Sequence, residues 1–153
     1  WAVGLSGTIL KWDGSTWTAQ TSGSIEYLRG VWGSDASNIW AVGDFGTILK
    51  WNGTSWTAQT SGTSQSLNGL WGAGSSTIWA VGASGVIVKW NGSTWSSDGG
   101  PLQSLFGVWG SDASNLWVVG EAGAILNANY DSPIRTYTDP RMEMSCRLPG
   151  SPT

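Results

Sequence analysis

The sequence contains no histidine and only one cysteine, Cys146. The absence of histidine excludes catalytic triads that need an imidazole base and metal sites that need histidine ligands. A single cysteine has no partner for a disulfide bond within the chain, and a thiol without a neighbouring imidazole is a poor nucleophile. Cys146 is therefore interpreted as an ordinary strand residue.

Charged residues are also scarce, at 11% of the chain with a net charge of −3. The sequence has no run of basic residues, and Lys11, Lys50 and Lys89 are evenly dispersed. No nucleic acid partner is therefore predicted. No apolar stretch approaches the roughly 18 residues of a membrane-spanning helix, so no membrane span is predicted either.

Glycine and tryptophan, in contrast, are abundant, with 23 and 13 residues. All 13 tryptophans fall into a lattice with a period of 39 residues, which shortens to 38 before Trp109. Trp12, Trp51 and Trp90 form one of its rows. A period near 40 with internal turn signals is typical of helical pairs, solenoids or propeller blades.

Each repeat consists of short runs rich in Val, Ile, Thr and Trp, such as GVWGSD, NIWAVGD, GTILKW and SWTAQTSG. These runs predict four strands and no helix. Between the third and fourth runs stands Asn-Gly or Asp-Gly, a pair that readily adopts the two positive φ angles of a tight hairpin. Apolar residues on both faces require the sheets to stack. The sequence therefore predicts an all-β fold, a β-propeller of four-stranded antiparallel blades of about 39 residues, with about 3.5 to 4 blades per chain.

The recurring pattern L-x-G-V-W-G-S-D-A-S-x-I-W-A-V-G-x-x-G-T-I-L-K-W-[DN]-G-x-x-W resembles Asp-box (BNR-type) propellers, including photosystem II assembly-factor propellers, and tryptophan-rich tandem repeats of bacterial surface proteins. The resemblance covers residues 1 to about 127. It implies a propeller fold and an extracytoplasmic or cell-surface location. Asp13, Asn52 and Asn91 stand directly before glycine, unlike the usual Asp-box loop, and no catalytic residues of sialidase-type enzymes are found.

Residues 1–129 are predicted to form the blades, and residues 130–153 a tail of different composition. Trp1 is equivalent to Trp40, so the first blade starts part-way through its repeat. An open arc of blades exposes apolar faces and unpaired edges. We therefore expect the ring to be completed by a second copy, in a homodimer, or by the tail. The tail alternates apolar and polar residues in RMEMSCRL, and is interpreted as one or two closing strands or as a fusion or read-through segment.

Indole rings stack well on sugars, but rings that recur at strand positions are interpreted mainly as core. Those beside the Asn-Gly or Asp-Gly turn are expected to be more exposed than Trp32 or Trp40. They are the candidate binding residues for a glycan or protein ligand: Trp12, Trp17, Trp51, Trp56, Trp90 and Trp95.

Carboxylates recur at two positions of the repeat. Asp44 and Glu121 follow the second strand, and Asp35 and Asp112 follow W-G-S. In a ring, equivalent positions face one rim or channel, where oxygen ligands would suit Ca²⁺ or another divalent cation and a bound metal could activate water. The alternative, which we favour, is that Asp35 and Asp112 cap a turn.

The favoured functional hypothesis is a propeller-type binding or interaction module with a glycan or protein ligand. The alternative is a metal-dependent ester or phosphoester hydrolase with a carboxylate-bound ion in the channel of the assembled ring. A third hypothesis is that this stretch of chain has no selected function. The fold alone does not decide among them.

Overall fold

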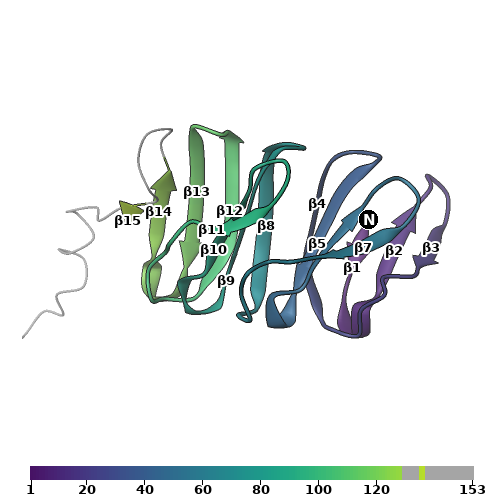
Figure 1. The fold of residues 1–153 in the computed structure, drawn as a ribbon, viewed down its shortest axis with the longest axis horizontal. Coiled ribbons are helices and arrows are strands. Elements are labelled where there is room, and N and C mark those ends of the chain that lie inside the picture. Colours follow the sequence, from purple (N-terminus) through teal and green to yellow (C-terminus); the bar gives the residue numbers. More distant parts are fainter. Residues whose placement is uncertain (129–134, 137–153) are drawn as a thin grey trace, which may run out of the picture.

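The computed structural model describes residues 1–128 and 135–136. These residues form four antiparallel sheets joined by short loops and four single 3-10 turns, so the predicted all-β fold is confirmed. The sheets stand in chain order along the long axis of the molecule, with the first at one end and the fourth at the other (Figure 1). No helix in this part of the chain is long and apolar enough to cross a membrane.

The first sheet contains β1 (Ala2–Val3), β2 (Ile9–Trp12) and β3 (Trp17–Gln20). The second contains β4 (Leu28–Asp35), β5 (Asn38–Gly43), β6 (Ile48–Trp51) and β7 (Trp56–Gln59). The third contains β8 (Leu67–Gly74), β9 (Thr77–Gly82), β10 (Ile87–Trp90) and β11 (Trp95–Ser97). The fourth contains β12 (Leu105–Asp112), β13 (Asn115–Gly120), β14 (Ile125–Ala128) and β15 (Arg135–Thr136).

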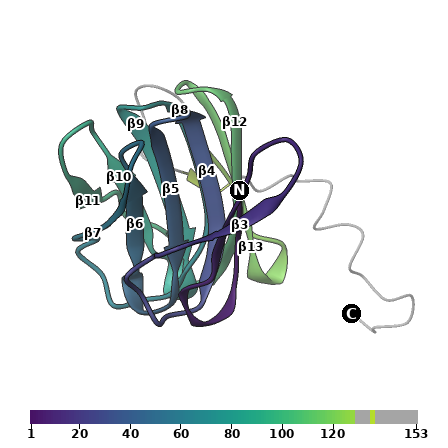
Figure 2. The ribbon, with the colours of Figure 1, turned by 90° about the vertical axis from the view of Figure 1, so that its right-hand side faces the viewer.

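In every four-stranded sheet the strands are ordered as in the chain. The first strands of these sheets, β4, β8 and β12, lie next to one another, and we call them the inner strands. Figure 2 shows them grouped together, with β7 and β11 on the far side of the sheets. The described residues form no closed ring, because the first and fourth sheets lie at opposite ends of the row.

The Asn-Gly and Asp-Gly pairs do turn the chain between the third and fourth strands, but not in the predicted conformation. A four-residue loop separates β6 from β7, and only its glycine, Gly53, has a positive φ, of 102°. The Asn52 side chain instead accepts hydrogen bonds from the backbone N–H groups of Thr54 (2.9 Å) and Ser55 (3.0 Å). Asparagine thus closes this turn with its own amide oxygen, a role that aspartate fills equally well.

The pair of positive φ angles is found between the second and third strands, where the sequence carried no Asn-Gly signal. There the chain forms the 3-10 turns η1 (Leu5–Gly7), η2 (Asp44–Gly46), η3 (Ala83–Gly85) and η4 (Glu121–Gly123). In η2, φ is 53° at Phe45 and 69° at Gly46. A methyl group added to Gly46 would lie 2.0 Å from the carbonyl oxygen of Thr63, so this position also requires glycine.

Neighbouring sheets are held together by three clusters of buried apolar side chains. The cluster between the second and third sheets brings Trp40 and Ile48 against Leu67, Ile78 and Trp90. Similar clusters join the first sheet to the second and the third to the fourth. A fully buried indole hides roughly 150–250 Å², which stabilises the fold by at most about 4–6 kcal/mol. Tryptophan therefore provides much of the adhesion between these glycine-rich sheets.

Candidate functional site

One contact between indole rings is repeated at the junctions of the first three sheets. The ring of Trp40, in β5 of the second sheet, packs against a pair of rings in the third sheet, Trp90 and Trp95. The ring centroids are 4.8 Å and 5.4 Å away. The equivalent contact between the first and second sheets has distances of 5.2 Å and 5.3 Å, and is made by Trp1 with Trp51 and Trp56. The first and the second sheet thus each insert one indole into a tryptophan pair of the following sheet.

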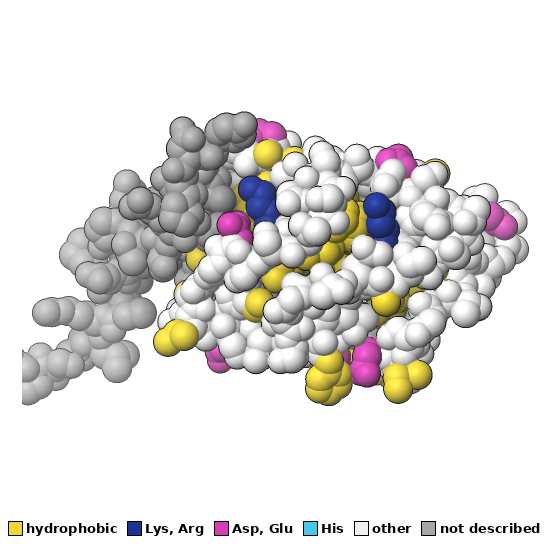
Figure 3. Space-filling view, in the orientation of Figure 1, with side chains coloured by type: hydrophobic (Ala, Val, Ile, Leu, Met, Phe, Trp, Pro, Cys, Tyr) yellow, Lys and Arg dark blue, Asp and Glu magenta, His cyan; other side chains and the backbone are white. Residues whose placement is uncertain are grey.

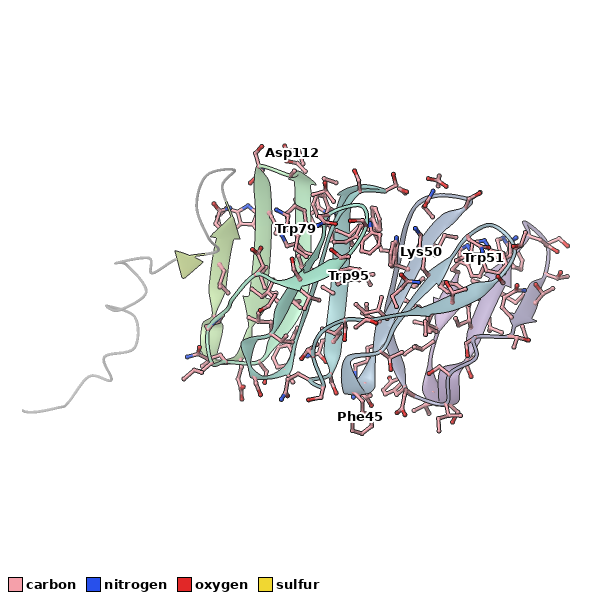
Figure 4. The ribbon with its side chains drawn as sticks, viewed as in Figure 1. Phe45, Lys50, Trp51, Trp79, Trp95 and Asp112 are labelled. Carbon is pink, nitrogen blue, oxygen red and sulfur yellow. The ribbon has the colours of Figure 1, made fainter. Side chains whose placement is uncertain are left out.

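A lysine side chain accompanies this contact. The ammonium nitrogen of Lys50 lies 4.9 Å from the centroid of Trp40 and 5.4 Å from that of Trp90, so it bridges two sheets by cation–π interactions. Lys11 bridges Trp1 and Trp51 in the same manner, at 5.5 Å and 5.6 Å. Figure 4 shows Lys50 and Trp51 among the side chains between the strands. Lys89 lies over the ring of Trp79 in its own sheet, at 4.9 Å. Lys11 and Lys50 therefore have a structural role at the junctions between sheets.

The first sheet presents the same tryptophan pair without a preceding sheet. Trp12 and Trp17 have centroids 5.4 Å apart and planes inclined by 44°, close to the 5.8 Å and 49° of Trp51 and Trp56. Their exposed fractions are 45% and 51%, against 6% and 8% for Trp51 and Trp56. The pair at the end of the row therefore has the geometry of an internal junction but remains open to solvent.

The fourth sheet exposes apolar side chains at the opposite end. Trp109 is 63% exposed and Val119 is 49% exposed. Trp117, which occupies the repeat position of Trp1 and Trp40, is 37% exposed and donates its indole N–H to Asn115 Oδ1 at 3.0 Å. Asn127 replaces the bridging lysine in this sheet. Both ends of the row are thus apolar surfaces of the kind that the internal junctions bury.

The six candidate ligand-binding tryptophans consequently differ in environment. The expected exposure is confirmed for Trp12 and Trp17. It is wrong for the others, because the indole of the preceding sheet covers each pair: Trp51, Trp56, Trp90 and Trp95 are all at most 8% exposed. Trp32, expected to be less exposed than these, is only partly buried. Among these six, only the pair on the first sheet offers ring faces to a ligand.

Asp35 and Asp112 close the turns between the first two strands of their sheets. Asp35 accepts hydrogen bonds from the backbone N–H of Ser37 at 2.8 Å and from the Asn38 side chain. These bonds lower the pKa of Asp35 below its ordinary value of 3.8. The backbone N–H of Ser114 similarly donates to Asp112 and lowers the pKa of that carboxyl. Both carboxylates thus serve as turn caps (Asp112 is labelled in Figure 4).

Asp44 forms an ion pair that sequence reasoning missed. Its Oδ1 accepts a hydrogen bond from Arg29 Nε at 2.6 Å, and this bond lowers the pKa of Asp44. Glu121, at the equivalent position of the fourth sheet, accepts a hydrogen bond from the backbone N–H of Ser104 at 3.4 Å. No group of three or more Asp, Glu or Cys side chains able to hold a metal occurs in residues 1–128. The four candidate metal ligands are therefore not brought together within one chain.

Comparison with known proteins gave no relatives: no family model matches the chain, and no curated protein is similar to it. The likeness to Asp-box and tryptophan-rich repeats accordingly remains a prediction from the repeat pattern.

Proposed function

We propose that this chain is an interaction module of the β-propeller type whose copies associate with one another, the fourth sheet of one copy packing on the first sheet of the next. Two copies would bring eight sheets into one ring, within the usual range of four to eight blades. The observation that carries this proposal is the open Trp12–Trp17 pair, which repeats the geometry of two buried internal pairs.

Trp117 has the repeat position to fill that pair. Trp1 and Trp40 occupy the same position in their sheets, and each inserts between the two tryptophans of the following sheet. A second copy would therefore bury Trp117 against Trp12 and Trp17, by the contact that already joins the sheets within the chain. Burial of two half-exposed indoles also removes an apolar patch of a kind that monomeric proteins rarely expose.

The experiment is a measurement of mass in solution by sedimentation across a range of concentrations. We expect a dimer for the unmodified protein and a monomer for the double variant Trp12→Ser/Trp17→Ser. Phe45→Ala is the matched control, because Phe45 is 72% exposed but lies in the turn between β5 and β6 of the second sheet, and this variant should still dimerise. Circular dichroism verifies that each variant is folded.

A protein that is monomeric at every concentration contradicts the proposal, and so does a double variant that still dimerises. The same exposed pair would also suit a sugar ring. If the unmodified protein stays monomeric and binds a glycan that the double variant does not bind, a lectin function replaces the proposed one.

A further inference from the structure

The 3-10 turns lie at one end of the sheets, together with the linkers that join consecutive sheets. These linkers are residues 21–27, 60–66 and 98–104. The backbone N–H of Asp44 in η2 donates to the carbonyl oxygen of Tyr27 in the first linker at 2.9 Å, and equivalent bonds join η3 to the second linker and η4 to the third. The N–H of Gly7 in η1 donates to Glu26 of the first linker at 2.7 Å. We call this surface, formed by the 3-10 turns and the linkers, the turn rim.

Large apolar side chains project from the turn rim into solvent. Ile25 of the first linker is 86% exposed, Phe45 of η2 is 72% exposed and Leu102 of the third linker is 92% exposed. Leu5 and Tyr27 are exposed on the same rim. Figure 3 shows apolar and acidic side chains protruding together at the lower edge of the molecule, where Figure 4 places Phe45. The described turns at the opposite end of the sheets contain only Ala, Gly, Ser, Thr, Asn and Asp.

Comparison of the repeats shows that the fold does not require these apolar side chains. Tyr27 and Ser66 accept the same hydrogen bond from the following 3-10 turn, so the first two linkers align residue by residue. In this alignment Ile25 corresponds to Ser64. Phe45 corresponds to the serines of η1 and η3. Because serine meets the structural needs of these positions, the exposed apolar side chains are best explained by a contact outside the chain.

The turn rim is also acidic. The guanidinium of Arg29, at the start of β4, is engaged by Asp44 at 2.6 Å and lies 4.8 Å from the centroid of the Tyr27 ring. The other rim carboxylates form no ion pair in the described part of the chain, and these are Glu26, Asp98 and Glu121. A ligand that presents cations among apolar side chains would therefore complement this surface in both respects.

We propose that the turn rim around Ile25, Tyr27 and Phe45 is a docking surface for a basic peptide segment of another protein. Apolar side chains of the segment pack on the exposed apolar groups of the rim, and its lysine or arginine side chains lie next to Glu26 and the other unpaired carboxylates. The same carboxylates are repelled by an anionic lipid surface, so charge favours a basic peptide over a membrane.

The turn rim is separate from the surfaces used for self-association. Trp12 and Trp17 flank the outer hairpin loop of the first sheet, at the end of the strands opposite to η1. The docking surface therefore does not depend on the proposed function, and the two can be tested independently.

The test uses fluorescence anisotropy with a labelled synthetic peptide, GKLSGKFSGKLS, which presents lysines beside leucine and phenylalanine. We expect saturable binding to the full chain, and binding should weaken as NaCl rises from about 50 to about 500 mM, because salt screens the attraction between charges. A peptide with glutamate in place of lysine should bind at least about tenfold more weakly, and so should a peptide with serine in place of leucine and phenylalanine.

The repeats supply matched protein variants. Ile25→Ser/Phe45→Ser introduces the residues that the second linker and η3 already have, and should weaken binding at least about tenfold. Glu26→Gln introduces the residue of the second linker and should reduce the salt dependence of binding. Asn52→Asp is the control, because it adds a carboxylate to a turn at the opposite end of the sheets, where Asp13 already closes the equivalent turn, and it should leave binding unchanged.

Absence of peptide binding overturns the proposal, and so does binding that the double variant retains or that Asn52→Asp changes as strongly. If the double variant fails to fold, Glu26→Gln and the two control peptides decide. Sedimentation with vesicles of phosphatidylcholine and phosphatidylserine tests the other occupant: vesicle binding that the double variant loses, without peptide binding, would assign the rim to a membrane surface instead. A monomeric protein that binds the peptide would refute self-association alone, and a dimer that does not bind it would refute the docking surface alone.

Discussion

Phe45 is the bulkiest of four side chains that the repeats hold at a positive φ. Its φ is 53°, and the equivalent positions carry Ser6, Ser84 and Ala122 at 51–54°. The left-handed region costs a residue with a Cβ roughly 1–2 kcal/mol. The ring is 72% exposed and contributes little buried area. Figure 3 shows hydrophobic side chains protruding along the lower edge of the molecule, where Figure 4 places Phe45.

Phe45→Gly should therefore stabilise the protein. Glycine removes the backbone strain, and the greater entropy of the unfolded chain offsets part of the gain, so we expect the free energy of unfolding to rise by about 0.5–1 kcal/mol. Urea denaturation measures the change. Phe45→Ala, which removes the ring but keeps the Cβ, should be close to neutral, as Ala122 stands at the same place. A loss of stability in Phe45→Gly would show that contacts of the Phe45 ring stabilise the protein by more than its positive φ destabilises it.

At the scale of strands and turns, the sequence was informative where a residue type has one structural use. The spacing of Trp51 and Trp56 identified the third and fourth strands, and Asn52-Gly53 identified the turn between them. The predicted conformation of this turn was wrong. The Asn52 side chain accepts hydrogen bonds from backbone N–H groups of the loop, so the turn closes without a positive φ at Asn52. Phe45-Gly46 carries the two positive φ angles, and nothing in a phenylalanine signals that conformation.

Only part of the candidate site could be predicted from the sequence, because the exposure of a side chain depends on the packing between sheets. Repetition identified equivalent tryptophans, but the exposure of a pair depends on whether another sheet packs on it. Trp12 and Trp51 end the same strand sequence, ILKW, and differ in exposure.

The outer hairpin turns offer a controlled test of pH dependence. Asp13 accepts hydrogen bonds from the backbone N–H groups of Thr16 and Ser15, both at 2.8 Å, and these bonds lower its pKa below 3.8. Its contribution to stability is thus complete above the ordinary pKa and is lost as the pH falls through the lowered value in the folded state. Asn52 and Asn91 make the same bonds without a titrating group.

Asp13→Asn should therefore leave the melting temperature at pH 7 nearly unchanged and reduce its fall between pH 4 and pH 2. Thermal melts followed by circular dichroism over this range provide the comparison. Asp44→Asn is the contrasting variant, because it breaks the ion pair with Arg29 and should already lower the melting temperature at pH 7. Identical acid profiles for Asp13→Asn and the unmodified protein would show that protonation leaves this turn intact.

At the scale of the whole molecule, the four described sheets form a row in which the extensive contacts of each sheet are with its neighbours along the chain. Stability in such an array is set by each unit and its junctions, so a unit at an end is the weakest. The first two sheets contain the same strand sequences, ILKW in β2 and β6 and WTAQ in β3 and β7. Their burial nevertheless differs, since Trp12 is 45% exposed and Trp51 is 6% exposed.

Amide hydrogen exchange can therefore compare identical sequences at two positions in the row. Equal sequences exchange at equal intrinsic rates. Ile9 and Leu10 of β2 pair with strands on both sides, as Ile48 and Leu49 of β6 do, so a difference in rate at these residues reports local opening. At high dilution, where self-association is suppressed, amides of β2 and β3 should exchange at least about tenfold faster than those of β6 and β7, a difference of ~1.4 kcal/mol. As the concentration rises, a docked second copy should cover the first sheet, and the two rates should converge. Equal rates at high dilution would show that the sheets open as one cooperative unit, and a difference that persists at every concentration would show that no copy covers Trp12 and Trp17.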